Sequence, residues 1–310
     1  MTKILVLLSS YNGDRFIKEQ IESVLSQKDV NVNLLIRDDG STDDTLQILH
    51  SLQLKHNNID VVNGQNVGCA DSFRWLLNEA YIRRKEYDYF SFCDQDDFWL
   101  PEKLSIACKE LDRMGNTKPC MYCSNLHVVD ENLKGMGLKW NPDESFITKE
   151  QSLVCSMATG CTMVFNNPVL EVFYNFPPQQ LRVHDLWVMH ICMFLGYIYY
   201  DRNSYILYRQ HGHNVIGAKT TLKSKMKSRW LSLKHLLSQN ENRDESREIL
   251  SSYGHLLSDE DRKKIETVAN YKENWKNRLR FLFRIGTKTQ GICRKKDNYI
   301  LNIRIFLGVV

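Results

Sequence analysis

The sequence predicts an α/β fold, with a mainly parallel β-sheet covered by helices on both faces and a helical C-terminal region behind it. Strand and helix patterns alternate through the first hundred residues, as they do in successive βαβ units. Hydrophobic residues make up 43% of the 310 residues and charged residues 25%, which is typical of folded globular proteins. After residue 217 the strand patterns stop, so we expect two domains, at residues 1–216 and 217–310.

The first hundred residues contain four apolar runs that predict buried strands, and helical spacing of apolar residues between them. The predicted strands are Ile4–Ser9, Val32–Arg37, Ile59–Val62 and Tyr87–Cys93. The predicted helices are Asp14–Gln27, one from about Thr42, and Asp71–Tyr81. Ligands of such sheets bind beyond the carboxyl ends of the strands, so the segments that follow these strands form the candidate site.

The next hundred residues continue the alternation less regularly. Proline suits the first turn of a helix, and Pro101 therefore predicts a helix over residues 101–114. Residues 130–150 contain glycines and a proline, and we expect a mobile loop near a site. Strand patterns return at Thr162–Phe165 and Tyr197–Tyr208, with a helix from about His184 between them.

The C-terminal region is basic, whereas the rest of the chain is acidic. Residues 217–310 contain 21 Lys and Arg against 10 Asp and Glu, and residues 1–216 contain 20 against 27. We predict helices at 219–237, 241–257 and 259–285, of which the first has an apolar stripe bordered by lysines. A basic tail suggests an anionic surface such as phospholipid or nucleic acid. The alternative is that the stripe packs on the first domain or on a second copy of the chain.

Several classes of protein are disfavoured. The nine cysteines lie mostly among apolar neighbours, and the pair Cys120 and Cys123 has no second pair at zinc spacing, so we expect buried, reduced thiols and a cytoplasmic location. The apolar run at residues 4–8 is too short for a signal peptide, and residues 186–200 fall short of a membrane span of ~20 residues. Motifs of P-loop, dinucleotide-binding and serine hydrolase sites are absent from the sequence.

The most informative feature is the acidic cluster Asp94, Asp96 and Asp97, which directly follows a predicted strand. Carboxylates this close repel one another and need a compensating cation, and their oxygens suit Mg²⁺ or Mn²⁺. The alternative is a solvated acidic turn that caps the helix at Pro101. The apolar flank at residues 98–100 argues against a freely solvated turn.

Other polar segments have two interpretations each. Asp38 and Asp39 end a strand and suit ribose or base contacts, whereas Ser41 or Thr42 suits the N-cap of the next helix. Asp185 suits a general base beside a sugar, but an aspartate at a helix start is more often a cap.

Four motifs occur in a characteristic order. They are Ser-Tyr-Asn at 10–12, Asp-Asp-Gly-Ser-Thr-Asp at 38–43, Asn-Val-Gly at 66–68, and Asp-Gln-Asp-Asp at 94–97 followed by Trp-Leu-Pro at 99–101. Together they resemble the inverting family 2 glycosyltransferases of the GT-A fold, and bacterial rhamnosyltransferase-type enzymes of capsule or O-antigen synthesis in particular. The resemblance covers about residues 1–216 and leaves the tail unexplained.

The resemblance implies roles for individual residues. It implies donor-binding residues at Ser10, Tyr11, Asn12, Asp39, Asp94, Asp96 and Gly160. It implies that Asp97, Asp96 and His211 hold Mn²⁺ or Mg²⁺, and which two carboxylates of the cluster bind the metal stays open. Asp185 matches the catalytic base, with His184 in the place of the usual glutamate.

The resemblance also implies partners. We expect a nucleotide-diphosphate sugar as donor and a saccharide as acceptor, with a lipid-linked acceptor at the inner face of the cell membrane as one alternative. The basic helices would then contact anionic lipid as a peripheral membrane element or form a homodimer, and we expect no nucleic-acid partner. The competing functions are a nucleotidyltransferase and a non-catalytic subunit that only binds a nucleotide sugar.

Overall fold

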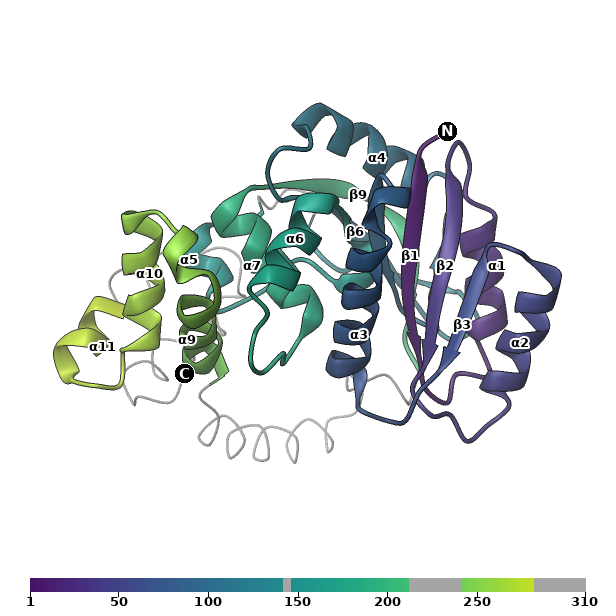
Figure 1. Ribbon diagram of the computed structural model, residues 1–310, viewed down its shortest axis with the longest axis horizontal. Coiled ribbons are helices and arrows are strands. Elements are labelled where there is room, and N and C mark those ends of the chain that lie inside the picture. The colour runs from purple at the N-terminus through teal and green to yellow at the C-terminus, as the bar shows by residue number, and fades with distance from the viewer. Residues whose placement is uncertain (142–145, 212–240, 282–310) are drawn as a thin grey trace. The chain divides into compact units, whose positions relative to one another are not determined.

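The computed structural model of the protein describes residues 1–141, 146–211 and 241–281 (Figure 1). The chain divides into two compact units. The N-terminal unit comprises residues 1–143, 158–177 and 181–210, and the C-terminal unit comprises residues 144–157, 178–180 and 211–310. The predicted domain boundary after residue 216 lies outside the described residues and stays a prediction.

The first four strands of the N-terminal unit are parallel neighbours in the order β3-β2-β1-β4 (Figure 1). They are β1 (Lys3–Ser10), β2 (Asn31–Asp38), β3 (Ile59–Asn63) and β4 (Tyr89–Cys93). In this register Ser10 pairs with Asp38, and Leu8 pairs with Cys93. The segments after β1, β2 and β4 therefore lie side by side at one edge, as the sequence predicts.

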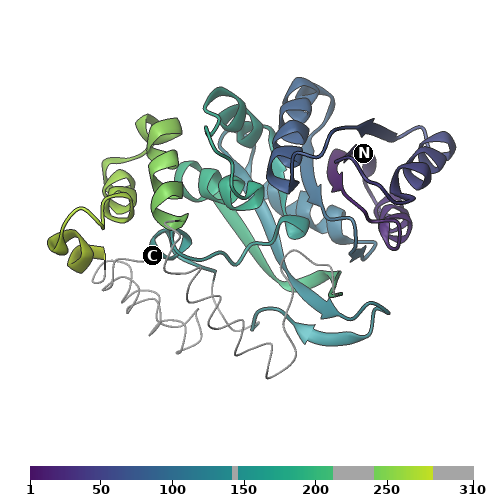
Figure 2. The ribbon, with the colours of Figure 1, turned by 90° about the horizontal axis from the view of Figure 1, so that it is seen from below.

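The sheet continues beyond β4 with strands of mixed direction. These are β8 (Val164–Asn166), β6 (Cys120–Val129), β9 (Tyr197–Arg209), β5 (Phe98–Trp99) and β7 (Gly135–Leu138). β8 is antiparallel to β4 and β6, while β9 is parallel to β6 and antiparallel to β5. β7 forms an antiparallel pair with the end of β6 (Figure 2), so the loop expected at 130–150 is in part a strand.

Helices cover both faces of the sheet, as predicted. α1 (Ile17–Leu25), α2 (Thr45–Lys55) and α4 (Lys103–Met114) share a buried apolar cluster with the residues of β1 that point to their side. The opposite layer consists of α3 (Cys69–Ile82), α6 (Asn167–Asn175) and α7 (His184–Leu195), and α3 packs on β1 (Figure 1).

β1 separates the two layers because its side chains alternate. Ile4, Val6 and Leu8 lie in the cluster with α1, α2 and α4, and the intervening Leu5 and Leu7 point to the opposite face. All five are at most 1% exposed. Burying a side chain of this size stabilises the fold by about 1.5–3 kcal/mol, so this strand is a rigid support for the residues that follow it.

The remaining short elements connect these layers. They are the 3₁₀ turns η1 (Arg84–Glu86), η2 (Gly160–Thr162) and η3 (Gly254–Leu256) and the helix α5 (Lys149–Ser152). The eight cysteines of the described residues form no disulfide, and six of them are buried, in line with the expected reduced thiols.

The C-terminal unit is helical where it is described. It contains α5 together with α9 (Glu241–Tyr253), α10 (Asp259–Ala269) and α11 (Trp275–Phe281). Lys149 joins α5 to α10 through a 2.7 Å contact with Asp261. The single helix expected at 259–285 is wrong, because the chain leaves the helix after Ala269 and starts again at Trp275. The amphipathic helix predicted at 219–237 lies outside the described residues.

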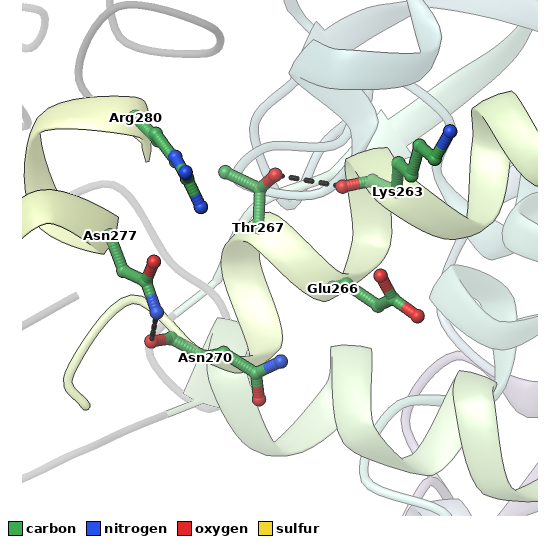
Figure 3. A pocket seen from close by; sticks show the side chains of 6 residues that line it. All are labelled: Lys263, Glu266, Thr267, Asn270, Asn277 and Arg280. Atoms are coloured by element: carbon green, nitrogen blue, oxygen red, sulfur yellow. Dashed lines mark hydrogen bonds between the residues drawn. The ribbon is translucent and has the colours of Figure 1, made fainter. Parts of the chain in front are cut away.

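α10 and α11 also line a polar pocket of about 400 Å³ (Figure 3). Its lining residues are Lys263, Glu266, Thr267, Asn270, Asn277 and Arg280. None of the residues with a predicted role lies in it. Within the described ranges, we find no helix with the length and hydropathy that a bilayer span requires.

Candidate active site

Asp38 organises the corner where β1 and β2 end. Its Oδ1 accepts hydrogen bonds from the hydroxyls of Ser10 (3.1 Å) and Ser41 (2.6 Å), and its Oδ2 accepts one from the Ser41 N–H (2.9 Å). The Ser41 hydroxyl in turn accepts from the Asn12 N–H, and Asn12 Oδ1 accepts from the Thr42 N–H. Asn12 has a φ of 47°, which asparagine tolerates better than most residues. The motifs at residues 10–12 and 38–43 therefore fix each other's conformation through these hydrogen bonds.

The helix-cap interpretation of this segment is wrong. α2 begins at Thr45, and its N-cap residue is Asp44, whose side chain makes no capping hydrogen bond. The Ser41 hydroxyl is occupied by Asp38, and the Thr42 N–H is occupied by Asn12. Ser41 and Thr42 therefore hold the strand ends, and Asp43 holds the start of α2, because its Oδ1 accepts from the N–H (3.0 Å) and the hydroxyl (2.5 Å) of Thr45.

Asp39 is the centre of a second buried network. Its Oδ1 accepts from the Arg37 guanidinium and from the Val67 N–H (3.0 Å), and its Oδ2 accepts from the Gly68 N–H (2.9 Å). Arg37 also donates to the Gln65 carbonyl (2.9 Å). Asp39 is 2% exposed and Arg37 is 6% exposed. The ion pair ties residues 65–68 to the end of β2, and the donor contact predicted for Asp39 stays a prediction.

Gln95 connects this corner to the acidic cluster. Its side-chain amide makes two hydrogen bonds with the backbone of Tyr11, accepting from the N–H (2.8 Å) and donating to the carbonyl (3.1 Å). The Tyr11 side chain remains exposed, as a residue that contacts a ligand needs to be. A Cβ at Gly13 would lie 2.4 Å from Gln95 Oε1, so a larger residue there would displace the Gln95 amide from Tyr11. The sequence analysis missed Gln95.

Asp94, Asp97 and Cys161 come together below the end of β4. One ligand atom from each, two carboxylate oxygens and the Cys161 Sγ, lies within 4.8 Å of the others. Asp97 is completely buried, and its Oδ1 accepts from the Arg209 N–H (3.1 Å). Its Oδ2 has no hydrogen-bond partner among the described residues. A buried carboxylate oxygen without a donor is costly, which fits a position that a cation completes.

The electrostatics of this cluster also favour a cation. Burial, followed by the charges of Asp96 and Asp185, raises the pKa of Asp94 to about 7. Burial, Asp94 and Asp96 raise the pKa of Asp97 well above its usual range. Burial, followed by the charges of Asp97 and Asp94, raises the pKa of the Cys161 thiol. A divalent cation removes the repulsion that causes these shifts, and carboxylate oxygens are the ligands that Mg²⁺ and Mn²⁺ prefer.

Asp96 lies outside this set of ligand atoms, although its charge acts on both neighbours. The structure therefore brings Asp97 together with Asp94 and Cys161, and the predicted role of Asp96 as a metal ligand stays a prediction. The interpretation of the cluster as a helix cap is wrong, because the N-cap of α4 is Glu102.

Asp185 is held against the turn that contains Cys161. Its Oδ2 accepts from the Gly160 N–H (2.9 Å), and its Oδ1 accepts from the Leu186 N–H (2.7 Å). A Cβ at Gly160 would lie 3.2 Å from His184 Nε2 and 3.4 Å from Asp185 Oδ2. Glycine at this position allows the close approach. The N-cap residue of α7 is Val183, so Asp185 does not have the cap position that was its alternative interpretation.

His184 lies behind this turn in an aromatic setting. Its ring stacks on Phe73 at 3.7 Å between centroids and meets Phe92 edge-on. Burial lowers the pKa of His184 to about 4, so the imidazole is neutral at pH 7. Its Nε2 has no hydrogen-bond partner among the described residues. The ring therefore adds no positive charge beside Asp185.

Two lysines near the cluster were missed by the sequence analysis. Lys139 donates to the Thr159 hydroxyl (2.8 Å), and burial lowers its pKa while Cys161 and the carboxylates Asp185, Asp94 and Asp97 act in the opposite direction. Lys103 is completely buried, with its Nζ 3.6 Å from the Trp99 ring centroid, and burial lowers its pKa to about 8. The only sequence signal for Lys139 is its place in the 130–150 segment.

Arg209, at the end of β9, fixes the acidic loop. Its backbone N–H bonds Asp97, its Nε donates to the Asp96 carbonyl (2.9 Å), and its guanidinium pairs with Glu19 of α1. The sequence analysis chose His211, two residues further on. His211 belongs to the C-terminal unit, and its predicted role as a metal ligand stays a prediction.

Several known proteins are similar to this chain in sequence or in fold. The dTDP-rhamnosyl transferase RfbG of Shigella flexneri is 29% identical over 238 residues, which cover 71% of this chain and 77% of that protein. The structure is similar to that of S. aureus TarS in complex with UDP-GlcNAc, with a TM-score of 0.60, 17% identity, and coverage of 99% of this chain and 90% of that chain.

A second similar structure is the mannosyltransferase PcManGT from Pyrobaculum calidifontis in complex with GDP-Man and Mn²⁺. Its TM-score is 0.54 at 12% identity, and the match covers 99% of this chain and 80% of that chain. These two structures confirm the predicted GT-A fold. Residues 5–173, more than half of the chain, match the profile described as Glycosyl transferase family 2. The chain belongs to glycosyl transferase family 2.

Proposed function

We propose that the protein is a metal-dependent, inverting glycosyltransferase that moves a sugar from a nucleotide-diphosphate donor to a saccharide acceptor. One observation carries the proposal. The turn at Gly160 and Cys161 bonds Asp185 on one side and adjoins the carboxylates of Asp94 and Asp97 on the other. A base and a divalent-cation site are the two parts that such a transfer requires next to each other.

Asp94 and Asp97 are the residues that would hold Mn²⁺ or Mg²⁺. The unpartnered Oδ2 of Asp97 and the raised pKa of Asp94 fit a cation, whereas the neutral thiol of Cys161 is a poor ligand for Mg²⁺. When bound, the metal supplies positive charge for the diphosphate that leaves. Mn²⁺ is present in the PcManGT complex, which supports the choice of ion.

The chemistry of the chain's own residues centres on Asp185. Its carboxylate takes the proton of the acceptor hydroxyl as the hydroxyl oxygen attacks the anomeric carbon. The bond between that carbon and the phosphate oxygen breaks, and the nucleoside diphosphate leaves with the electron pair. Hydrogen bonds from the N–H groups of Gly160 and Leu186 orient the carboxylate.

The nucleotide is assigned to the corner of β1 and β2. Ser10, Tyr11, Asn12 and Asp39 would shape its pocket, with the exposed Tyr11 ring offering a stacking surface. The similarity to the dTDP-rhamnosyl transferase RfbG supports a deoxythymidine diphosphate sugar as donor, and we propose bacterial surface polysaccharide as the product.

The association with anionic membrane or with a second copy of the chain depends on the basic segment 219–237, which lies outside the described residues. A lipid-linked acceptor would place the enzyme at the membrane surface. Salt-sensitive co-sedimentation of the full chain with vesicles of anionic phospholipid tests this hypothesis, and no difference between anionic and neutral vesicles would contradict it.

Release of nucleoside diphosphate tests the proposed function. We expect release from a dTDP-sugar or UDP-sugar in the presence of an oligosaccharide acceptor, with activity lost in EDTA and restored by Mn²⁺. Release of pyrophosphate would instead indicate a nucleotidyltransferase. Binding of donors without turnover would indicate a non-catalytic subunit.

A further inference from the structure

Lys139 lies beside the turn that joins the base to the acidic cluster. Its Nζ is 2.8 Å from the hydroxyl of Thr159. Thr159 directly precedes Gly160 and Cys161, which adjoin Asp185 and the cluster carboxylates respectively. The positive charge is therefore located at the place where the donor's diphosphate and sugar meet in the proposed function.

Three hydrogen bonds fix the backbone of Lys139 and of the residue that follows it. β6 is irregular at Asn125, where its pairing with β9 shifts register. The completely buried Asn125 side chain donates to the Trp140 carbonyl (2.8 Å) and accepts from the Trp140 N–H (3.1 Å), and the Lys139 N–H bonds the Leu126 carbonyl (3.0 Å). Bulges near active sites commonly re-aim a neighbouring side chain, and this one secures the residue that follows Lys139.

Lys139 differs from the other cations of the N-terminal unit that lie near the site. Arg37 is paired with Asp39, Arg209 is paired with Glu19, and Lys103 is completely buried. Lys139 is exposed, and its hydrogen-bond partner is a neutral hydroxyl. Among the described residues its ammonium pairs with no carboxylate, so its charge can pair with an anionic ligand.

The charges of the site leave a role for this ammonium. A divalent cation offsets the two carboxylates of Asp94 and Asp97, so the negative charge of the diphosphate still lacks a partner. That charge grows on the phosphate next to the sugar as the sugar leaves. A fixed cation at this point stabilises the transition state more than the ground state.

We propose that Lys139 binds the phosphate group adjacent to the transferred sugar and balances the charge that develops on it. This inference rests on the proposed function and adds a contact that the sequence motifs do not contain. It makes the β6–β7 hairpin, residues 120–140, part of the donor site. The ammonium exchanges its contact with the Thr159 hydroxyl for one with the phosphate when the donor binds.

Titration calorimetry with UDP and dTDP in the presence of Mn²⁺ tests the inference, with UMP and dTMP as probes that lack the second phosphate. Lys139→Met removes the charge and keeps much of the side-chain length, and Lys139→Arg keeps the charge. Lys134→Met, on the turn of the same hairpin, is the matched control. Thermal denaturation midpoints equal to that of the wild type show that each variant is folded.

We expect Lys139→Met to weaken diphosphate binding at least about 10-fold, to change monophosphate binding less than about 2-fold, and to lower kcat by about 10²–10³. Lys139→Arg should recover most of the affinity, and Lys134→Met should bind as the wild type does. Equal affinities of wild type and Lys139→Met for the diphosphates would overturn the inference alone, and so would a loss confined to the KM of the acceptor. Failure of the wild type to bind any nucleoside diphosphate would overturn the proposed function as well.

Discussion

The corner formed by residues 10–13 and 37–41 and the acidic cluster around Asp97 both contain several carboxylates, but these carboxylates find their partners in different ways. Asp38 and Asp39 each accept three or more hydrogen bonds from the chain itself. Asp97 has an oxygen with no partner among the described residues, and the pKa of Asp94 is raised to about 7. The carboxylates of the corner obtain all of these partners when the protein folds. In the proposed function, the carboxylates of the cluster obtain theirs only when a cation binds.

Because of this difference, the carboxylates of the two regions have opposite effects on the stability of the folded protein. A carboxylate that satisfies buried donors contributes to stability, and its loss leaves those donors unpaired. A carboxylate surrounded by like charges lowers stability until a cation arrives. Substitutions in the corner should therefore affect folding first, and substitutions at the cluster should affect turnover and metal binding first.

The largest effect is expected at the cluster side, from Asp185→Asn. Asparagine can still accept the hydrogen bond from Gly160 but cannot take a proton from the acceptor. We expect kcat to fall by about 10²–10⁴ while the donor affinity changes less than about 2-fold. Steady-state rates combined with calorimetric donor binding measure both quantities. A parallel loss of donor affinity or of thermal stability would show that Asp185 supports the structure instead.

A matched pair of isosteric changes compares the two regions directly. Asp39→Asn removes the counter-charge of the buried Arg37 and presents an amide where the Gly68 N–H needs an acceptor. We expect it to cost about 3–5 kcal/mol of unfolding free energy. Asp97→Asn can keep the bond from the Arg209 N–H and relieves charge repulsion. Metal-free Asp97→Asn should be at least as stable as the wild type near pH 8.

Thermal and urea denaturation of both variants in EDTA provide the measurement. In Mn²⁺ the wild type should become more stable than Asp97→Asn, because the wild type gains stability from the metal and the variant does not. If Asp39→Asn and Asp97→Asn lowered the free energy of unfolding equally in EDTA, the proposed difference between the corner and the cluster would be wrong.

The smallest expected effect is a pH dependence of the stabilisation by Mn²⁺. The pKa of Asp94 is about 7 in the folded, metal-free protein and about 3.9 in an unfolded chain. The folded state therefore binds this proton more tightly, and the stability it contributes is present below about pH 4 and lost as the pH rises through 7. Mn²⁺ should raise the denaturation midpoint by a few degrees more at about pH 8 than at about pH 5.5. Asp94→Asn should reduce the difference, with the remainder due to the raised pKa of Asp97, and an equal shift at both pH values in the wild type would contradict the assignment.

Much of the fold could be predicted because its signals are local. The strands β1 to β4 are apolar runs, and their parallel order brings the three polar segments to one edge without further information. β7 was missed because its sequence is Gly-Met-Gly-Leu, in which two glycines favour a loop, and only pairing with β6 makes it a strand. The break between α10 and α11 was missed although two asparagines mark it, Asn270 at the end of α10 and Asn274, whose side chain accepts from the Asn277 N–H (2.9 Å) at the start of α11.

The site was predictable where motifs carry the chemistry and unpredictable where distant residues complete it. Asp97, Asp185 and Gly160 follow from recognisable segments. Lys139 and Arg209 reach the site through the β6–β7 pair and the end of β9, which are set by long-range register. A single lysine or arginine in a sequence does not indicate where such a strand ends.

The position of Cys161 has a consequence for metal selectivity in the cell. A thiol within 4.8 Å of two carboxylates makes the cluster a mixed set of oxygen and sulfur ligands. Soft ions such as Cd²⁺ can displace the thiol proton and bind sulfur and oxygen together, whereas Mg²⁺ gains nothing from the sulfur. The cluster that is proposed to hold Mn²⁺ or Mg²⁺ would therefore also bind thiophilic metals, and such ions would inhibit the enzyme by occupying the site.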